Sequence, residues 1–169
     1  MTRPLLFVGT LIVLLSACAS QRSAPDMDPP TSINSTLNNF HVAASRADFD
    51  GYFATWSDQS VFLGTDATER WEGKQFKDFA KPYFEKGQGW TYLPRDRHIS
   101  TSKDGNIAWF DELLDNDKYG ECRGSGVLLR GTEGTGGWVI VQYNLSFPIP
   151  NDIAGDVTAK IKAAKAGRK

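Results

Sequence analysis

The apolar residues in the first half of the chain recur at helical spacing in three separate segments. A repeat every three or four residues places these side chains on one face of a helix. The stripes consist of Ile33, Leu37, Phe40 and Ala44, then Phe49, Tyr52, Phe53 and Trp56, then Phe76, Phe79, Ala80, Tyr83 and Phe84. We therefore expect two short helices separated near Ser45, and a third that begins near Lys74 and stops by Gly89.

The second half of the chain changes to the pattern of β-strands. Four segments rich in β-branched and aromatic residues cover 90–101, 107–116, 120–130 and 138–147. Short polar turns containing Gly or Asn separate them, which favours an antiparallel sheet of consecutive strands. A brief earlier strand is expected at 60–63, followed by a polar loop over 64–73.

Large apolar residues occupy both alternating positions of the last strand. Strict alternation puts Trp138 and Ile140 on one face and a second apolar set on the other: Val139, Val141, Tyr143 and Leu145. One face of an antiparallel sheet usually meets water. Two apolar faces therefore imply that something packs against each of them. We expect the helices on one face and a second copy of the chain, in a homodimer, on the other. The alternative cover is the chain's own ends.

The N-terminus has the layout of a bacterial secretory signal. Arg3 precedes an apolar run from Leu5 to Leu15, which is too short to span a bilayer of about 30 Å. The next residues, Ser16, Ala17 and Cys18, resemble the bacterial lipobox, in which a small residue precedes a cysteine that is acylated before cleavage. This resemblance implies a signal peptide over 1–17 and a membrane anchor on Cys18. An ordinary signal cut near Ala17 is the alternative.

Residues 18–31 are small, polar and rich in proline, which is typical of a tether. Several acyl chains, as the lipoprotein resemblance implies, would hold the domain stably at a membrane of the cell envelope, facing the periplasm. Because Ala19 rather than an acidic residue follows the cysteine, the same resemblance favours the outer membrane over the inner. Cys122 then has no intrachain partner, so we expect a fold without a disulfide.

Composition limits the remaining possibilities. With 169 residues, of which 40% are hydrophobic, the chain holds one domain, which we place at 32–153 before a C-terminal helix and basic tail at 154–169. The net charge of -1 favours no nucleic-acid partner. His41 and His98 lack neighbours at metal-ligand spacing, and no phosphate loop or dinucleotide fingerprint occurs. We therefore expect neither a metal nor another cofactor.

Three local segments and the order of elements resemble the SnoaL-like members of the nuclear transport factor 2-like superfamily. The segments are GTDATERWEG at 64–73, AWFDE at 108–112 and WVIVQYNLS at 138–146. The resemblance implies an α+β fold in which a cone-shaped, curved antiparallel sheet wraps on N-terminal helices around a cavity. This fold hosts isomerases, cyclases, dehydratases and non-catalytic domains, so it does not name a reaction.

Asp111 and Glu112 are the best candidates for acid–base catalysis. Adjacent residues of a strand point to opposite faces, so only one of the two can face a cavity. Asp111 shares a face with the apolar residue Trp109. Apolar surroundings would raise the pKa of the Asp111 carboxyl group if that group were buried. The alternative is a structural ion pair between one of these carboxylates and Arg123 or Arg130, and Arg123 is also a candidate anchor for an anionic ligand.

Other candidate pocket residues come from the helices and from the last strand. Tyr52, Trp56 and Tyr83 are candidates for a cavity wall, although aromatic residues at helical spacing belong more often to a core. Gln142 and Asn144 stand in a row of hydrogen-bonding side chains that either orients a ligand or faces solvent or a subunit. By the family resemblance, many relatives carry a histidine at Asn144, and an amide cannot replace it as a general base.

These observations favour a tethered module that binds a small, partly apolar molecule without transforming it. The first alternative is an enzyme of the isomerase, cyclase or dehydratase type that uses Asp111 or Glu112. The second is a homodimeric assembly module. A pocket carboxylate without an arginine partner would favour the enzyme.

Overall fold

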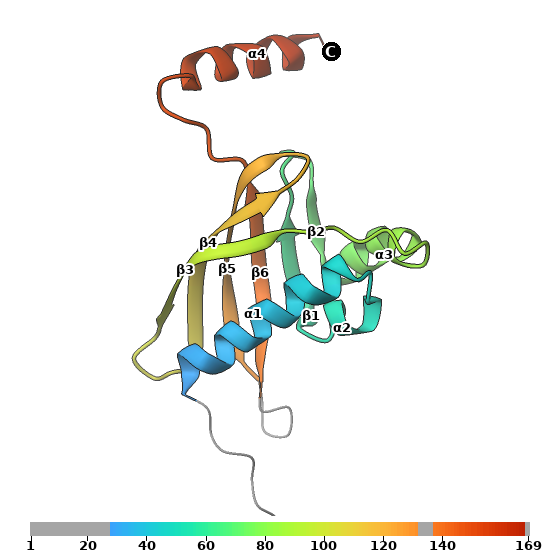
Figure 1. The fold of residues 1–169 in the computed structure, drawn as a ribbon, viewed down its shortest axis with the longest axis vertical. Helices are drawn as coiled ribbons and strands as arrows, with labels where there is room; N and C mark the ends of the chain where they lie inside the picture. The colour runs from blue at the N-terminus through green and yellow to red at the C-terminus, as the bar shows by residue number, and fades with distance from the viewer. Residues whose placement is uncertain (1–27, 132–136, 168–169) are drawn as a thin grey trace, which may run out of the picture.

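A curved six-stranded sheet carries helices on one of its faces (Figure 1). The structure is a computed structural model that describes residues 28–131 and 137–167. Its elements in chain order are α1 Pro29–Ser45, α2 Phe49–Phe53, β1 Trp56–Leu63, β2 Arg70–Glu72, α3 Gly73–Phe84, β3 Leu93–Thr101, β4 Ile107–Asn116, β5 Gly120–Arg130, β6 Trp138–Ser146 and α4 Ala154–Ala166. The α+β fold expected from the sequence is confirmed.

The strands follow the order β2-β1-β6-β5-β4-β3 across the sheet. The four long strands β3 to β6 pair antiparallel with their chain neighbours, as their short connections predict. The parallel pairing of β1 with β6 connects the β2–β1 pair to the four long strands, and it was not predicted. It joins the N-terminal third of the domain to its last strand, so the helices that flank β1 are held against the same sheet.

Two segments depart from their local patterns because sheet pairing prevails over helical spacing. Trp56, expected in the second helix, begins β1 and pairs with Ile140, while α2 ends at Phe53. Within the expected polar loop, residues 70–72 form β2 as a short edge strand on β1. A third difference does not involve the sheet. Helix α1 begins at Pro29, so the last residues of the expected tether are helical.

An irregularity in β6 changes which of its residues face the helices. Val127 pairs with Gln142, but the next residue, Leu128, pairs with Ile140, so β6 contains one extra residue at this point. Such a bulge reverses the alternation of faces. The buried residues are consequently Trp138 and Ile140 before the bulge and Tyr143 and Leu145 after it. The expectation that these two pairs occupy opposite faces is wrong.

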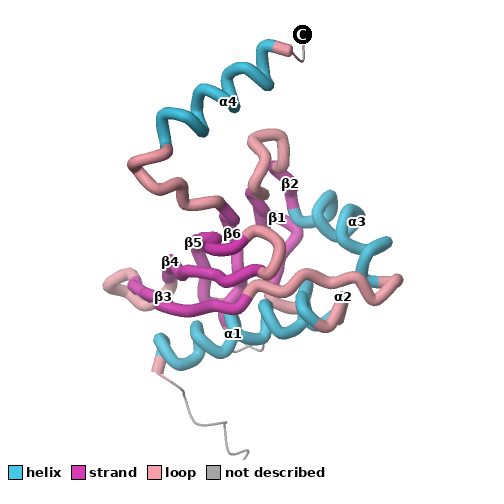
Figure 2. The backbone as a smooth tube through the Cα atoms, turned by 45° about the horizontal axis from the view of Figure 1, so that its top comes forward, coloured by secondary structure: helices cyan, strands magenta, loops and turns pink. Residues whose placement is uncertain are grey.

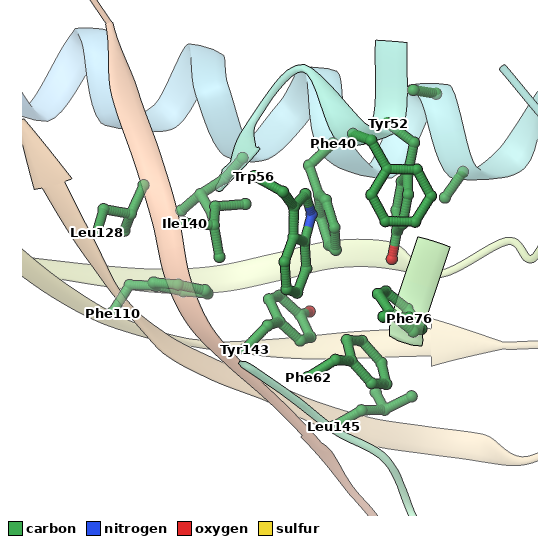
Figure 3. Close-up of a cluster of buried hydrophobic side chains, with 14 of the residues drawn as sticks. Phe40, Tyr52, Trp56, Phe62, Phe76, Phe110, Leu128, Ile140, Tyr143 and Leu145 are labelled. Carbon is green, nitrogen blue, oxygen red and sulfur yellow. The ribbon is translucent and has the colours of Figure 1, made fainter. Parts of the chain in front are cut away.

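Stacked aromatic rings fill most of the space between the helices and the sheet (Figure 3). Phe62 of β1 and Phe76 of α3 stack with their ring centroids 4.2 Å apart, and Phe40 of α1 stacks on Tyr52 of α2 at 4.6 Å. Each such ring removes a large apolar area from water, which makes this cluster the main source of stability. Cys122 is also buried there, as a free cysteine on the inner face of β5.

Helix α4 stands apart from the rest of the domain (Figures 1 and 2). None of its residues is buried. Ile161 of the helix and Ile153, the residue just before it, are both nearly half exposed. The sequence predicts a peripheral helix with a thin apolar edge, and the structure confirms that position. Because α4 packs on neither face, it does not cover the outer face of the sheet.

Candidate functional site

A cavity of about 470 Å³ lies between the three packed helices and the β1–β6 part of the sheet. Helices α1, α2 and α3 and the segment after α3 contribute Phe40, His41, Ala44, Tyr52, Phe76, Phe79, Tyr83, Trp90 and Tyr92. The sheet contributes Phe62, Trp71, Tyr143 and Leu145. The walls are therefore mainly aromatic, and a ligand that fills them must present mainly apolar surface.

The β1–β2 loop and the β4–β5 turn also contribute residues to the cavity lining. Thr65 and Glu69 come from the loop, and Lys118 and Tyr119 come from the turn. The Lys118 ammonium lies 4.7 Å from the centre of the Tyr119 ring. One cation and one carboxylate are thus part of a lining that is otherwise mainly aromatic.

A buried carboxylate, Glu112, lies behind the cavity wall and is bound by three side chains. Its Oε1 lies 2.7 Å from Nε2 of His41 in α1 and accepts a hydrogen bond of 3.1 Å from the hydroxyl of Tyr143 in β6. Its Oε2 accepts a 2.7 Å hydrogen bond from Nε of Arg97 in β3. Both His41 and Tyr143 line the cavity, so this network forms part of its wall.

Arg97 links the same network to the first half of α1. Its Nη1 donates to the side-chain oxygens of Asn34, at 3.1 Å, and Asn38, at 2.8 Å. Its Nη2 is buried and has no partner among the described residues. The guanidinium therefore compensates the Glu112 charge and also fixes α1 against β3.

Gly124 makes the room that this network needs. It pairs directly with Glu112 across the β4–β5 ladder. A side chain at this position would place its Cβ 2.3 Å from the Tyr143 hydroxyl and 3.0 Å from Oε1 of Glu112. Only glycine leaves the Tyr143 hydroxyl in contact with the carboxylate.

The surroundings set the protonation of these groups. Burial by itself raises the pKa of Glu112, but the hydrogen bond and charge of His41, together with those of Arg97, outweigh burial and hold that pKa below its ordinary value of 4.5. Burial, followed by the neighbouring Glu112 charge, raises the pKa of Tyr143 well above 10.0. Glu112 is therefore ionised and Tyr143 neutral at physiological pH.

Tyr52 presents a polar atom with no partner. Its side chain is fully buried, and its hydroxyl forms no hydrogen bond with any described residue. Figure 3 shows the Tyr52 ring between α1 and the sheet, close to Phe40 and Phe76. A buried hydroxyl without a partner is unfavourable by itself. The side chain that acts on this hydroxyl is Trp90, which lowers the pKa of Tyr52 against the larger effect of burial.

The structure brings only part of the predicted pocket together. Tyr52 and Tyr83 line the cavity, whereas Trp56 belongs to the buried core beside it. Of the two candidate carboxylates, Glu112 faces the helices and Asp111 faces outward. Glu112 pairs with Arg97, not with the expected Arg123 or Arg130.

Five other predicted pocket residues lie on the outer face of the sheet. Three of them alternate with the buried residues of β4 and β5, and two follow the bulge in β6: Trp109, Asp111, Arg123, Gln142 and Asn144. For the last two, the bulge is the physical reason, since strict alternation would have placed them on the face of Trp138. The prediction that these five residues line the cavity is wrong.

Most of the cavity lining was not predicted, and neither were the three partners of Glu112, namely His41, Arg97 and Tyr143. His41 follows Leu37 by four residues and is buried on the apolar face of α1, so its helical position was the signal that could have identified it. Arg97 gives no such signal, because it stands in a strand segment, Arg95 to His98, in which every residue is polar. Within 28–131 and 137–167, no three His, Cys, Asp or Glu side chains form a group that could hold a metal.

A curved sheet wrapped on helices around an internal cavity defines the cone-shaped class of α+β folds. The sequence profile of the SnoaL-like domain matches residues 33–150 of this chain, which therefore belongs to the SnoaL-like domain family. The resemblance inferred from the three sequence segments is confirmed. No curated protein matches the chain by sequence.

Solved structures of low sequence identity share the fold. An NTF2-like protein of unknown function from Pseudomonas putida superposes with a TM-score of 0.59 at 13% identity, covering 72% of this chain and 87% of its own. A candidate dehydratase of the NTF2-like family from Streptomyces avermitilis gives 0.57 at 13% identity, covering 72% and 97%. A candidate ketosteroid isomerase from Shewanella frigidimarina gives 0.54 at 13%, covering 70% and 98%. At this identity the likeness concerns the fold alone.

We predict that Glu112→Gln weakens the fold and flattens its response to acid. The neutral amide leaves Arg97 buried without its counter-charge, which should cost about 3 kcal/mol of unfolding free energy at pH 7. A carboxyl group with a lowered pKa stabilises the folded state above its unfolded pKa, and this contribution is lost as the pH falls through the folded pKa. Urea unfolding from pH 7 down to below 4.5 should therefore show a steeper loss in the wild type than in the variant.

Glu85→Gln is the matched control, because Glu85 is an exposed carboxylate at the end of α3. It should leave both the stability at pH 7 and the slope of the acid response unchanged. Parallel curves of unfolding free energy against pH for the wild type and Glu112→Gln would contradict the assigned role of Glu112.

Proposed function

We propose that this SnoaL-like domain binds a small, mainly apolar molecule in its aromatic cavity. The observation that carries the proposal is the cavity itself: it has the volume of a small-molecule site, and its walls are mainly aromatic. The ligand class is a compact, largely planar molecule with few polar groups, because flat rings make the best contacts with these walls.

The Glu112 network supports binding without chemistry over acid–base catalysis. A general base needs a pKa near the working pH, whereas the partners of Glu112 lower its pKa. The carboxylate also has an arginine partner, which is the arrangement expected of a structural ion pair. An isomerase, cyclase or dehydratase that uses Glu112 as its base is therefore the weaker alternative, and Asp111 faces away from the cavity.

Blocking the cavity tests the binding proposal. Leu145→Trp enlarges a side chain that lines the cavity, and it should weaken binding of the neutral fluorescent probe N-phenyl-1-naphthylamine by about tenfold or more. Binding is measured by the rise in probe fluorescence, in the Cys18→Ser background so that no lipid competes. Leu93→Trp, at an exposed strand position outside the cavity, should bind the probe like the parent. Equal binding by both variants would contradict the proposal.

We further propose that the domain is held at the cell envelope by a lipid on Cys18. The support is the sequence of residues 1–18, which lie outside the described residues. The apolar run there and the lipobox-like residues before Cys18 carry the proposal, with the outer membrane favoured by Ala19. Within the described part of the chain, no helix has the length and apolarity to cross a membrane.

Lipidation has a direct test. Mass spectrometry of the mature protein should find acyl chains on an N-terminal Cys18, and Cys18→Ser should remove them and release the protein from the membrane fraction. Cys122→Ser changes the chain's other cysteine, which is buried in the domain, and should leave acylation unchanged. A wild-type N-terminal peptide without acyl mass would overturn the anchor.

We also propose that the outer face of the sheet pairs with a second copy of the chain. The β6 bulge removes the original argument from alternation, but an exposed apolar patch supports the same arrangement. Ile107, Trp109 and Leu129 are each more than 40% exposed on neighbouring strands. Asp111 and Arg123 share this face, so the patch carries one charge of each sign beside its apolar residues.

Sedimentation decides whether the patch is an interface. The Cys18→Ser protein should sediment as a dimer at micromolar concentration, and Trp109→Asp should shift it to monomer because a buried charge opposes association. Ile161→Asp places the same charge on α4, at a similarly exposed apolar residue, and should leave the dimer intact. A monomeric parent protein would reject the interface.

A further inference from the structure

The residues that line the cavity differ in their exposure to solvent. Most of the buried ones are aromatic, as are Tyr52, Phe62 and Phe76. The lining residues that are exposed are Thr65, Phe79, Tyr83, Lys118 and Tyr119. A ligand that fills the cavity therefore has one part enclosed by rings and another part close to water.

The exposed lining gathers at one end of the sheet. Strand β1 runs parallel to β6, and β4 and β6 are both antiparallel to β5, so the β1–β2 loop and the β4–β5 turn lie at the same end (Figure 1). Thr65 belongs to this loop, and Lys118 and Tyr119 belong to this turn. The positive charge of Lys118 thus stands at the exposed end of a mainly aromatic cavity.

Asn116 fixes the β4–β5 turn in place. Its Oδ1 accepts hydrogen bonds from the backbone N–H groups of Lys118, at 3.1 Å, and of Tyr119, at 2.9 Å. Its Nδ2 donates a 2.9 Å hydrogen bond to the carbonyl oxygen of Thr91. The turn is therefore attached to the segment that contributes Tyr92 to the cavity lining.

The polar side chains of this lining supply more hydrogen-bond donors than acceptors. The Lys118 ammonium contacts the Tyr119 ring but forms no ion pair with any described residue. Burial raises the pKa of the Tyr92 hydroxyl to about 12, so this group is also a donor at neutral pH. The carboxylate of the lining, Glu69, already accepts a 3.1 Å hydrogen bond at Oε2 from the backbone N–H of Asp66. A ligand group that accepts hydrogen bonds and carries a negative charge complements this set.

We propose that Lys118 binds an anionic group, such as a carboxylate, at the exposed end of a ligand whose apolar rings fill the interior of the cavity. This inference rests on the proposed binding function and specifies its ligand class. A lysine is charged at neutral pH, and an exposed lysine side chain can rotate toward the ligand. The anionic group also keeps contact with water there, which avoids the cost of burying a charge among rings.

Three probes with the same ring system and different head groups test this preference. They are 2-naphthoate, which is an anion, 2-naphthamide, which is neutral, and 2-naphthylmethylamine, which is a cation. Their affinities are measured by displacement of N-phenyl-1-naphthylamine from the Cys18→Ser protein. We expect 2-naphthoate to bind about fivefold more tightly than 2-naphthamide, which is the scale of one exposed ion pair. The difference should shrink in 1 M salt, because salt screens exposed charges.

Substitutions in the lining identify the source of the preference. Lys118→Gln should remove it, and Lys118→Arg should retain it because the charge is kept. Glu69→Gln removes a charge that repels the anion, so it should strengthen the binding of 2-naphthoate. Lys103→Gln is the matched control, because Lys103 is an exposed lysine in the β3–β4 turn, outside the cavity, and it should behave like the parent.

The outcomes separate this inference from the binding function. Equal affinity of 2-naphthoate and 2-naphthamide, or tightest binding of 2-naphthylmethylamine, overturns the anion preference while leaving the cavity as a binding site. A preference for 2-naphthoate that survives in Lys118→Gln assigns it to another group and also overturns the inference. Failure of every probe, including N-phenyl-1-naphthylamine, overturns the binding function and the preference together.

Discussion

The ionised Glu112 side chain is the constraint around which the rest of the domain is arranged. A charge removed from water is stable only when its partners are fixed around it, and here they come from three separate elements: His41 of α1, Arg97 of β3 and Tyr143 of β6. Arg97 extends the connection to Asn38 and Asn34, about one and two turns before His41 on the same helix. The network thus fixes the position of α1 over the sheet as well as satisfying the charge.

Local backbone features allow this arrangement. Gly124 leaves room for the Tyr143 hydroxyl beside Glu112, and the extra residue in β6 turns Tyr143 toward the helices. Without that bulge, strict alternation would have put Tyr143 on the outer face, with Gln142 and Asn144 inside. The same feature therefore supplies a partner to the carboxylate and makes the inner wall aromatic instead of amide-lined.

The sequence predicted the helices and strands that follow a repeated pattern of residues. It did not predict features that depend on one residue. Helix α3 and the strands β3 to β6 follow from periodicity and turn residues, and they appear within a few residues of their expected bounds. The bulge is one residue without a sequence signature of its own, yet it reverses the faces of the last strand. Trp56 likewise follows a helical spacing but joins β1, because pairing with β6 outweighs the local preference.

The site was harder to predict for the same reason. Two adjacent carboxylates in a strand are equivalent until the register of the sheet assigns one to each face, and the register gave Glu112 to the interior. Arg97 stands among other polar residues of an edge strand, so only the tertiary structure distinguishes it from Arg95, which binds surface carboxylates. His41, by contrast, occupied an apolar helical stripe in the sequence, where a polar residue needs a buried partner.

The charged network and the aromatic cavity depend on each other. Protein interiors normally close-pack, and a cavity of about 470 Å³ lined by rings loses the contacts that a filled core would gain. Collapse of α1 toward the sheet would recover those contacts, but it would compress the hydrogen bonds that Glu112 and Arg97 make with that helix. The cost of disturbing the buried ion pair between Glu112 and Arg97 thus holds the walls apart.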